Sequence, residues 1–214
     1  ERLMATATKQ VGANADDGYR LGDGSGGSFT FDNSAAYVSI GALNSGPGSQ
    51  DTTCYFRFLS VGIPAGSTIL TAKLQYKLNT AYSVASKTCD IHAEDVDSAG
   101  AIASDGAMTT SQAAKTSQKT TWTLATSSDT TNFLDSADFT VVIAAVVGRG
   151  GWAEGNNITI HLLNPTDAGM MEDREMKIKS HDSAGADAVK LVVTYTAPPK
   201  AGGVPQSLMI HDLL

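Results

Sequence analysis

The side chains with the greatest capacity for chemistry are carboxylates, which occur in short clusters along the chain. The clusters are Asp16-Asp17, Glu94 with Asp95 and Asp97, Glu172-Asp173, and Asp182 beside His181. Asp95 and Asp97 are two residues apart at the end of a predicted strand, so both carboxylates can point the same way. Hard oxygen donors bind Ca²⁺, although this spacing matches no EF-hand loop. We expect no required cofactor and treat Ca²⁺ at Asp95 and Asp97 as optional; solvated carboxylates that cap turns are the alternative.

The sequence contains none of the motifs that identify common hydrolases and nucleotide-binding enzymes. HExxH, GxSxG, a P-loop and a Gly-rich strand–helix fingerprint are absent. The four histidines, His92, His161, His181 and His211, do not have the spacing of zinc ligands. A glycoside hydrolase or lyase would need convergent carboxylates in a cleft, which no spacing here requires. We therefore predict a protein that is not an enzyme.

Exposed aromatic rings offer a second kind of chemistry, because flat sugar faces stack on rigid, amphipathic tyrosine and tryptophan side chains. The candidate rings for carbohydrate binding are Tyr19, Tyr55, Tyr82 and Trp122. Tyr55 is predicted on the strand face opposite Phe56 and Phe58, where either a ligand or a second layer of the protein would cover it. For any single ring the alternative is burial in the core.

Two cysteines, Cys54 and Cys89, are predicted on the inward faces of neighbouring strands. A disulfide between them would close a loop of about 35 residues and add roughly 3–4 kcal/mol of stability in the chain-entropy model. Two buried free thiols are the alternative, since unpaired cysteine packs as a small hydrophobic residue. Neither cysteine has the His and Asn arrangement that would indicate a nucleophile.

The elements that must position these residues are mostly β-strands, because apolar and polar residues alternate with period two in many segments. The predicted inward residues are Cys54, Phe56 and Phe58; Leu70, Ala72, Leu74, Tyr76 and Leu78; Cys89, Ile91 and Ala93; Ile158, Ile160 and Leu162; Met176 and Ile178; Leu191, Val193 and Tyr195. Clusters of Gly, Pro, Asn, Asp and Ser between these runs are typical of turns. The pattern predicts an all-β fold, a sandwich or jelly roll rather than βαβ units.

One apolar stretch can be interpreted either as a helix or as a buried strand. The residues that follow i, i+3, i+4, i+7 spacing are Phe139, Val142, Ile143 and Val146. Asp135, Ser136 or Asp138 would cap this helix, and Gly148 or Gly150 would end it. The β-branched residues also suit a buried strand, but we favour one short helix.

Composition excludes several classes of protein. The chain of 214 residues has 15 Lys+Arg against 22 Asp+Glu, a formal net charge of −7. A nucleic-acid binder needs a basic surface, so this partner is not expected. No run approaches the roughly 18 apolar residues of a membrane span, so membrane insertion is not expected. Hydrophobic residues, at 42%, are too numerous for a disordered chain.

Three segments are predicted along the chain: an extended N-terminal arm over residues 1–15, a β-sandwich domain over 16–196, and a flexible tail over 197–214. The arm would add a strand to a neighbour's sheet edge. The tail is a Pro/Gly linker followed by apolar residues that would dock into a partner, namely Leu208, Met209, Ile210, Leu213 and Leu214. Burial of each large side chain is favourable by ~1.5–3 kcal/mol, so these residues are expected to be buried. They could dock into a partner or pack back on the same domain, and the sequence does not decide between the two.

Five segments, taken in order, resemble the DNRLRE-type β-sandwich modules. They are DDGYR, YFRFLSVGIPAGSTILTAKLQY, CDIHAEDVDSAG, DFTVVIAAVVGRGGWAEGNNITIHL and KSHDSAGADAVKLVVTYT. The resemblance covers roughly residues 16–196, with ADAVKL in place of the usual Ala-Pro-x-Leu before the last strand. It implies a non-catalytic jelly-roll sandwich, of the kind that stands beside polysaccharide lyases as a carbohydrate-binding module or occurs among tailed-bacteriophage structural proteins.

The lone domain and its tethered apolar peptide favour the second setting. We predict a virion structural protein, a head decoration or tail-associated component on the virion surface. Its expected partners are other virion proteins or further copies of itself, with host glycans as possible ligands. The alternative is a secreted carbohydrate-binding module of a polysaccharide-degrading enzyme.

Overall fold

The fold is all-β, as the alternation predicts, with two antiparallel sheets and two α-helices. The computed structural model describes residues 4–22, 29–43, 50–85, 87–164 and 175–199. The strands are β1 (Met4–Gln10), β2 (Asp17–Gly22), β3 (Phe29–Asp32), β4 (Tyr37–Leu43), β5 (Gln50–Phe58), β6 (Thr68–Tyr76), β7 (Lys87–Ala93), β8 (Thr120–Leu124), β9 (Leu134–Asp135), β10 (Ile158–Leu163), β11 (Met176–Lys179) and β12 (Lys190–Thr196). The helices are α1 (Asp105–Ala113) and α2 (Thr140–Val147), with short 3-10 turns at Asn14–Asp16 and Gly185–Asp187.

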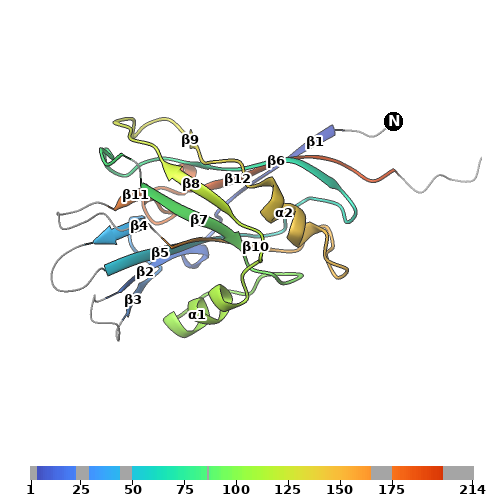
Figure 1. The fold of residues 1–214 in the computed structure, drawn as a ribbon, viewed down its shortest axis with the longest axis horizontal. Helices are drawn as coiled ribbons and strands as arrows, with labels where there is room; N and C mark the ends of the chain where they lie inside the picture. The colour runs from blue at the N-terminus through green and yellow to red at the C-terminus, as the bar shows by residue number, and fades with distance from the viewer. Residues whose placement is uncertain (1–3, 23–28, 44–49, 86, 165–174, 200–214) are drawn as a thin grey trace, which may run out of the picture.

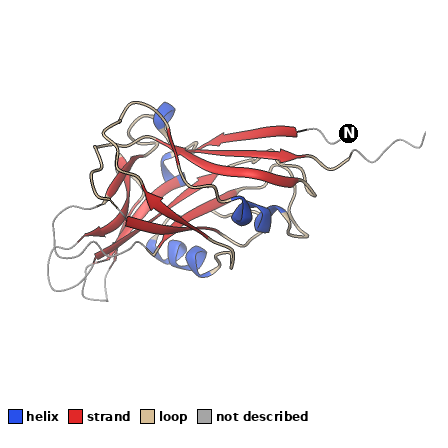
Figure 2. Cartoon of the chain, turned by 45° about the horizontal axis from the view of Figure 1, so that its top comes forward, coloured by secondary structure: helices blue, strands red, loops and turns tan. Residues whose placement is uncertain are grey.

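The two sheets form the layers of a sandwich. The smaller sheet has the order β1-β12-β6-β9, and the larger follows β11-β4-β5-β10-β7-β8, with β2 paired to β5 and β3 paired to β2. Helix α2 packs against β6 and β7, whereas α1 lies on the side of the larger sheet remote from the smaller one (Figure 1 and Figure 2). An all-β sandwich is therefore confirmed, and its jelly-roll connectivity stays a prediction.

The main core lies between the sheets and contains the inward residues that the alternation predicts, with one exception. Phe56 and Phe58 of β5 are fully buried there. Leu70 was predicted inward but is 42% exposed, and Ile69 is buried in its place. The cause is a β-bulge, since Thr71 pairs with Thr194 and Ile69 with Tyr195, so that Leu70 is an extra residue in the ladder.

The described residues form two α-helices, where the sequence predicted one. Helix α2 is the predicted one: the residues at helical spacing are buried, and Gly148 ends the helix as expected. Its N-cap is Phe139 and none of the predicted residues, although the Asp138 carboxylate accepts the Thr140 backbone N–H (2.9 Å). Helix α1 was not predicted. Its only large buried apolar residue is Met108, so apolar periodicity gave no signal for it.

Of the two alternatives left open for Cys54 and Cys89, the structure shows the free thiols and not the disulfide. Cys54 and Cys89 are buried free thiols, and burial raises the pKa of both. Their strands, β5 and β7, are not neighbours, because β10 pairs with both of them and lies between. Strands two apart in a sheet are separated by about 9.5 Å, beyond the roughly 7 Å between Cα atoms that a disulfide spans.

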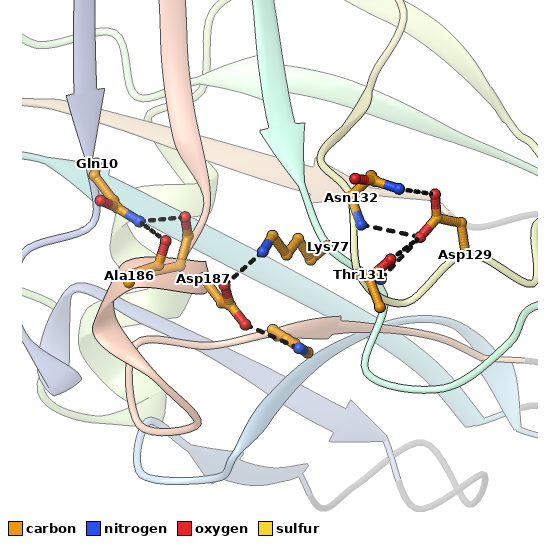
Figure 3. Close-up of polar contacts among 9 residues, drawn as sticks. Gln10, Lys77, Asp129, Thr131, Asn132, Ala186 and Asp187 are labelled. Carbon is orange, nitrogen blue, oxygen red and sulfur yellow. Dashed lines mark hydrogen bonds and ion pairs between the residues drawn. The ribbon is translucent and has the colours of Figure 1, made fainter.

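The N-terminal residues, expected as an extended arm that adds a strand to a neighbour's sheet, form the edge strand β1 of the chain's own smaller sheet. All seven residues of β1 pair with β12. The Gln10 side chain donates from Nε2 to the carbonyl oxygens of Ala186 (3.1 Å) and Ala188 (2.9 Å) (Figure 3). In the same turn the Asp187 carboxylate is paired with the ammonium groups of Lys77 (2.7 Å) and Lys179 (2.9 Å). These contacts fix β1 and the turn that precedes β12.

Replacing Phe58 by Ala will destabilise the fold by about 3–5 kcal/mol, because a fully buried aromatic side chain leaves a cavity in the core. Chemical denaturation of both proteins measures the difference in free energy of unfolding. Leu59→Ala is the matched control, since Leu59 is 38% exposed and its loss should cost less than about 1 kcal/mol. Equal losses in the two variants would contradict the assigned faces of β5.

Cys54 and Cys89 will both resist a thiol reagent in the native protein and both react in denaturant without added reductant. Burial excludes the reagent and disfavours the reactive thiolate in the folded state. The colour change with Ellman's reagent counts the thiols directly. A denatured, unreduced protein with no reactive thiol would show that the two are bridged after all.

Candidate functional site

The three central strands of the larger sheet are covered on their outer face as well as on the core face. Strand β10 is buried at all six positions, including the polar residues Thr159 and His161. On β7, His92 is also buried, and on β5, Tyr55 is fully buried. Helix α1 and the segment before it cover Tyr55 and His161 (Figure 1), and the Thr116 carbonyl, which follows α1, lies 2.9 Å from Nδ1 of His92.

Local chemistry defines the start of α1 and the face that it buries. Ser104 is the N-cap, and its Oγ accepts the backbone N–H of Ala107 (3.2 Å). Met108 and Ser111, three residues apart, are the buried positions of the helix. Met108 packs with Tyr55 and Ile102 in a small second apolar cluster, separate from the main core. The Tyr55 hydroxyl donates to the Ile102 carbonyl (3.1 Å).

Ser111 joins the helix to the sheet by a hydrogen bond. Its Oγ lies 2.8 Å from Nε2 of His161, so α1 is tied to β10. Ser111 and Glu94, the residue that follows β7, line the same pocket, and the Ser111 hydroxyl lowers the pKa of the Glu94 carboxyl.

This pocket, of about 320 Å³, opens beside Ser111. Its lining residues are Glu94, Gly100, Ala101, Ile102, Gly106, Ala107, Thr110 and Ser111. Four of these eight residues are glycine or alanine, so much of the lining has short side chains. The polar side chains among them are one carboxylate and two hydroxyls. This volume is at the lower end of the roughly 300–1,000 Å³ typical of small-molecule sites.

The carboxylate of Glu94 is the hydrogen-bond acceptor at this pocket, and opposing effects act on its pKa. Burial raises the pKa of Glu94, while the hydrogen bond from Ser111 and the charge of Arg57 lower it. Glu94 Oε2 is buried and has no hydrogen-bond partner among the residues that the structure describes. Arg57 is itself held by the Asp16 carboxylate (2.8 Å) and the Ala99 carbonyl (3.2 Å). The pocket therefore offers an acceptor whose negative charge is partly compensated.

The Ser111–His161 pair does not have the properties of a catalytic dyad. Burial lowers the pKa of His161 to about 3, far from the neutral value at which a general base is most effective. Nδ1 of His161 is buried without a hydrogen-bond partner among the described residues, so no carboxylate orients the ring from behind. The arrangement is chemically suited to holding a ligand by hydrogen bonds.

Three of the four predicted sugar-stacking rings are buried, which contradicts that prediction for them. Tyr55 lies under α1, Tyr82 is 4% exposed, and Trp122 is 3% exposed with an edge contact to Tyr76 (ring centroids 5.2 Å apart). Only Tyr19 is half-exposed, and it stacks on Tyr37 with ring centroids 6.2 Å apart. For Tyr55, the alternative of a second protein layer is the correct one.

The structure gives Asp95 and Asp97 a partner within the chain. Arg149 pairs with both, through Nη1 to Asp95 and through Nε to Asp97 (2.7 Å). Across the described part of the chain, no group of three or more His, Cys, Asp or Glu side chains is placed to hold a metal ion. The optional Ca²⁺ stays a prediction, and the two carboxylates already neutralise a cation.

The predicted docking residues, Leu208, Met209, Ile210, Leu213 and Leu214, lie outside the described residues. Neither described helix is long and apolar enough to cross a membrane. Comparison with protein-family models and with curated proteins finds no match to this chain. The inference of function therefore depends on the chemistry of the site itself.

Sequence patterns did not identify Glu94, Ser111 and His161 as a group. Glu94 was noted only as part of an acidic cluster, and His161 only as a histidine without zinc spacing. One signal was present, because Ser104 and Asp105 are typical of a helix start and Met108 and Ser111 share one helical face. A helix here would have required a polar partner on the outer face of the sheet.

Asp17, the first residue of β2, is a buried acid whose protonation will make the stability depend on pH. It is 1% exposed, and its Oδ2 accepts the His181 backbone N–H (2.9 Å). Burial, with smaller contributions from Asp182 and Asp16, raises its pKa from 3.8 to about 7. The unfolded chain releases this proton at lower pH than the folded protein, so stability falls as the pH rises from about 4 to about 7.

Asp17→Asn removes this dependence while keeping an oxygen that accepts the His181 N–H. The variant should gain stability relative to the wild type between about pH 4 and pH 7, by a total on the order of 4 kcal/mol. Urea denaturation of both proteins across this range measures the gain. A difference in unfolding free energy that is the same at both ends of the range would contradict the buried neutral acid.

Proposed function

We propose that this protein is a non-catalytic β-sandwich module that binds a sugar residue of a glycan in the pocket beneath α1. The observation that carries the proposal is the Glu94 carboxylate at the pocket, with one buried oxygen that has no partner within the described residues. A buried acceptor of this kind gains most from a ligand that donates hydrogen bonds.

The lining favours a neutral hydroxylated ligand over a charged one. No Lys, Arg or His is among the lining residues, so a phosphate or carboxylate ligand would have no counter-charge. An ammonium ligand would compete with Arg57, which already compensates Glu94. Sugar hydroxyls can donate to Glu94 and to Thr110 Oγ1, whose own hydrogen is donated to the Gly106 carbonyl (3.0 Å).

Both predicted biological settings use such a module. A protein on a virion surface would use the pocket to hold host glycans, and a secreted module would use it to hold a polysaccharide near an enzyme. The resemblance to DNRLRE-type modules is consistent with either setting. The pocket takes one small ring, so a chain end or a branch is the expected epitope rather than the middle of a long polymer.

A pocket-filling variant tests the proposal. Gly100 lines the pocket, and a Cβ added there would meet no heavy atom within 4 Å, so Gly100→Trp adds an indole without a backbone clash. A glycan array selects the best ligand, and titration calorimetry then compares affinities. We expect Gly100→Trp to weaken binding by at least about tenfold, which is about 1.4 kcal/mol. Glu94→Gln should weaken it similarly, because a charge-assisted hydrogen bond is lost.

Gly12→Trp is the matched control, because a Cβ at Gly12 also meets nothing within 4 Å and Gly12 does not line the pocket. Its affinity should equal that of the wild type. Thermal unfolding shows whether each variant remains folded. No binding to any glycan on the array, or equal affinities for Gly100→Trp and Gly12→Trp, would rule out the pocket as a sugar site.

A further inference from the structure

Strand β1 is an edge strand without the features that usually protect an edge. Among the described residues it pairs with β12 alone, so the backbone groups on its other side point away from the sheet. Natural monomers protect such edges with prolines, bulges, several charges or very short strands. Residues Met4–Gln10 contain no proline and one charge, at Lys9, and their pairing with β12 has no register shift.

The other strands at the ends of the sheets are shorter. β3, β8, β9 and β11 have two to five residues each, whereas β1 has seven. Gln10 anchors one end of β1 through its two hydrogen bonds to the turn before β12 (Figure 3). Ala5 and Ala7 pack against the main core. The edge is therefore fixed before any partner arrives, which lowers the entropic cost of pairing.

We propose that β1 pairs antiparallel with β1 of a second copy of this chain, about a two-fold axis that passes through Ala7. This register uses all seven residues of the strand. It places Met4 opposite Gln10 of the second copy, Ala5 opposite Lys9, Thr6 opposite Thr8, and Ala7 opposite Ala7. No like charges meet.

This register is the one that pairs the most residues while keeping opposed side chains on the same face of the sheet. Opposed residues in an antiparallel pair share a face, so a slip of one residue would oppose the inward Ala7 to an outward threonine. A slip of two residues keeps inward side chains opposite inward ones, but it pairs only five residues of each strand. In the central register the exposed Thr6 and Thr8 form two Thr–Thr pairs, which stabilise a sheet. The two smaller sheets then form one continuous sheet, and the two-fold symmetry closes the assembly as a dimer.

Charge substitutions at Thr6 and Thr8 test the register. Both side chains are exposed, so neither substitution removes core packing. In the proposed pair, Thr6→Lys with Thr8→Lys opposes two lysines at each site and should raise the dimer dissociation constant by at least about tenfold. Thr6→Glu with Thr8→Lys is the matched control, because each glutamate then faces a lysine of the second copy. Sedimentation equilibrium from micromolar to millimolar protein measures the association of all three proteins.

We expect a dimer for the wild type and for the Glu/Lys variant, with the Lys/Lys variant shifted toward monomer. Circular dichroism and thermal unfolding confirm that both variants fold. A wild type that is monomeric throughout, a Lys/Lys variant that dimerises as tightly as the wild type, or a Glu/Lys variant that dissociates like the Lys/Lys variant overturns the proposal. Glycan binding by a monomer would leave the sugar pocket standing and remove only the dimer.

Discussion

The central strands of the larger sheet are buried on both faces, and the rest of the structure depends on how their outer face is covered. That face carries polar residues, His161 and Thr159 on β10 and His92 on β7. A buried imidazole without a hydrogen-bond partner costs roughly 1–3 kcal/mol, so an apolar cover would be unfavourable. Helix α1 supplies Ser111 to His161 and Met108 to Tyr55. This combination of one polar and one apolar contact fixes where the helix lies.

The site follows from this packing. Small residues on α1 and on the segment before it leave space beside Ser111, and Glu94 reaches that space from the end of β7. Burial keeps His161 neutral and leaves a Glu94 oxygen without a partner among the described residues, so the ligand that we propose would be held by hydrogen bonds, and His161 would be a poor general base. The pocket belongs to the larger sheet and the edge strand β1 to the smaller one, so the proposed sugar site and the proposed dimer interface lie on separate surfaces.

Period-two alternation predicted the core face of the strands because burial between the two sheets determines which residues can be apolar there. It failed where other interactions decide burial. Tyr55 was placed on the face opposite Phe56 and Phe58, and alternation did not show that α1 covers that face, because a helix with one large apolar residue has no periodic signal. Leu70 was misplaced because a bulge is invisible to alternation. The Cys54–Cys89 disulfide depended on strand order, which sequence order does not give.

The most direct test of the sugar pocket is a map of backbone amide chemical shifts as glucose, galactose, mannose or N-acetylglucosamine is added to ¹⁵N-labelled protein. Binding beneath α1 predicts shift changes at Glu94, at residues 100–102 and along residues 106–111, with the smaller sheet unaffected. Shift changes confined to the half-exposed pair Tyr19 and Tyr37, or no change with any of these sugars, would contradict the assignment of this pocket as a sugar site.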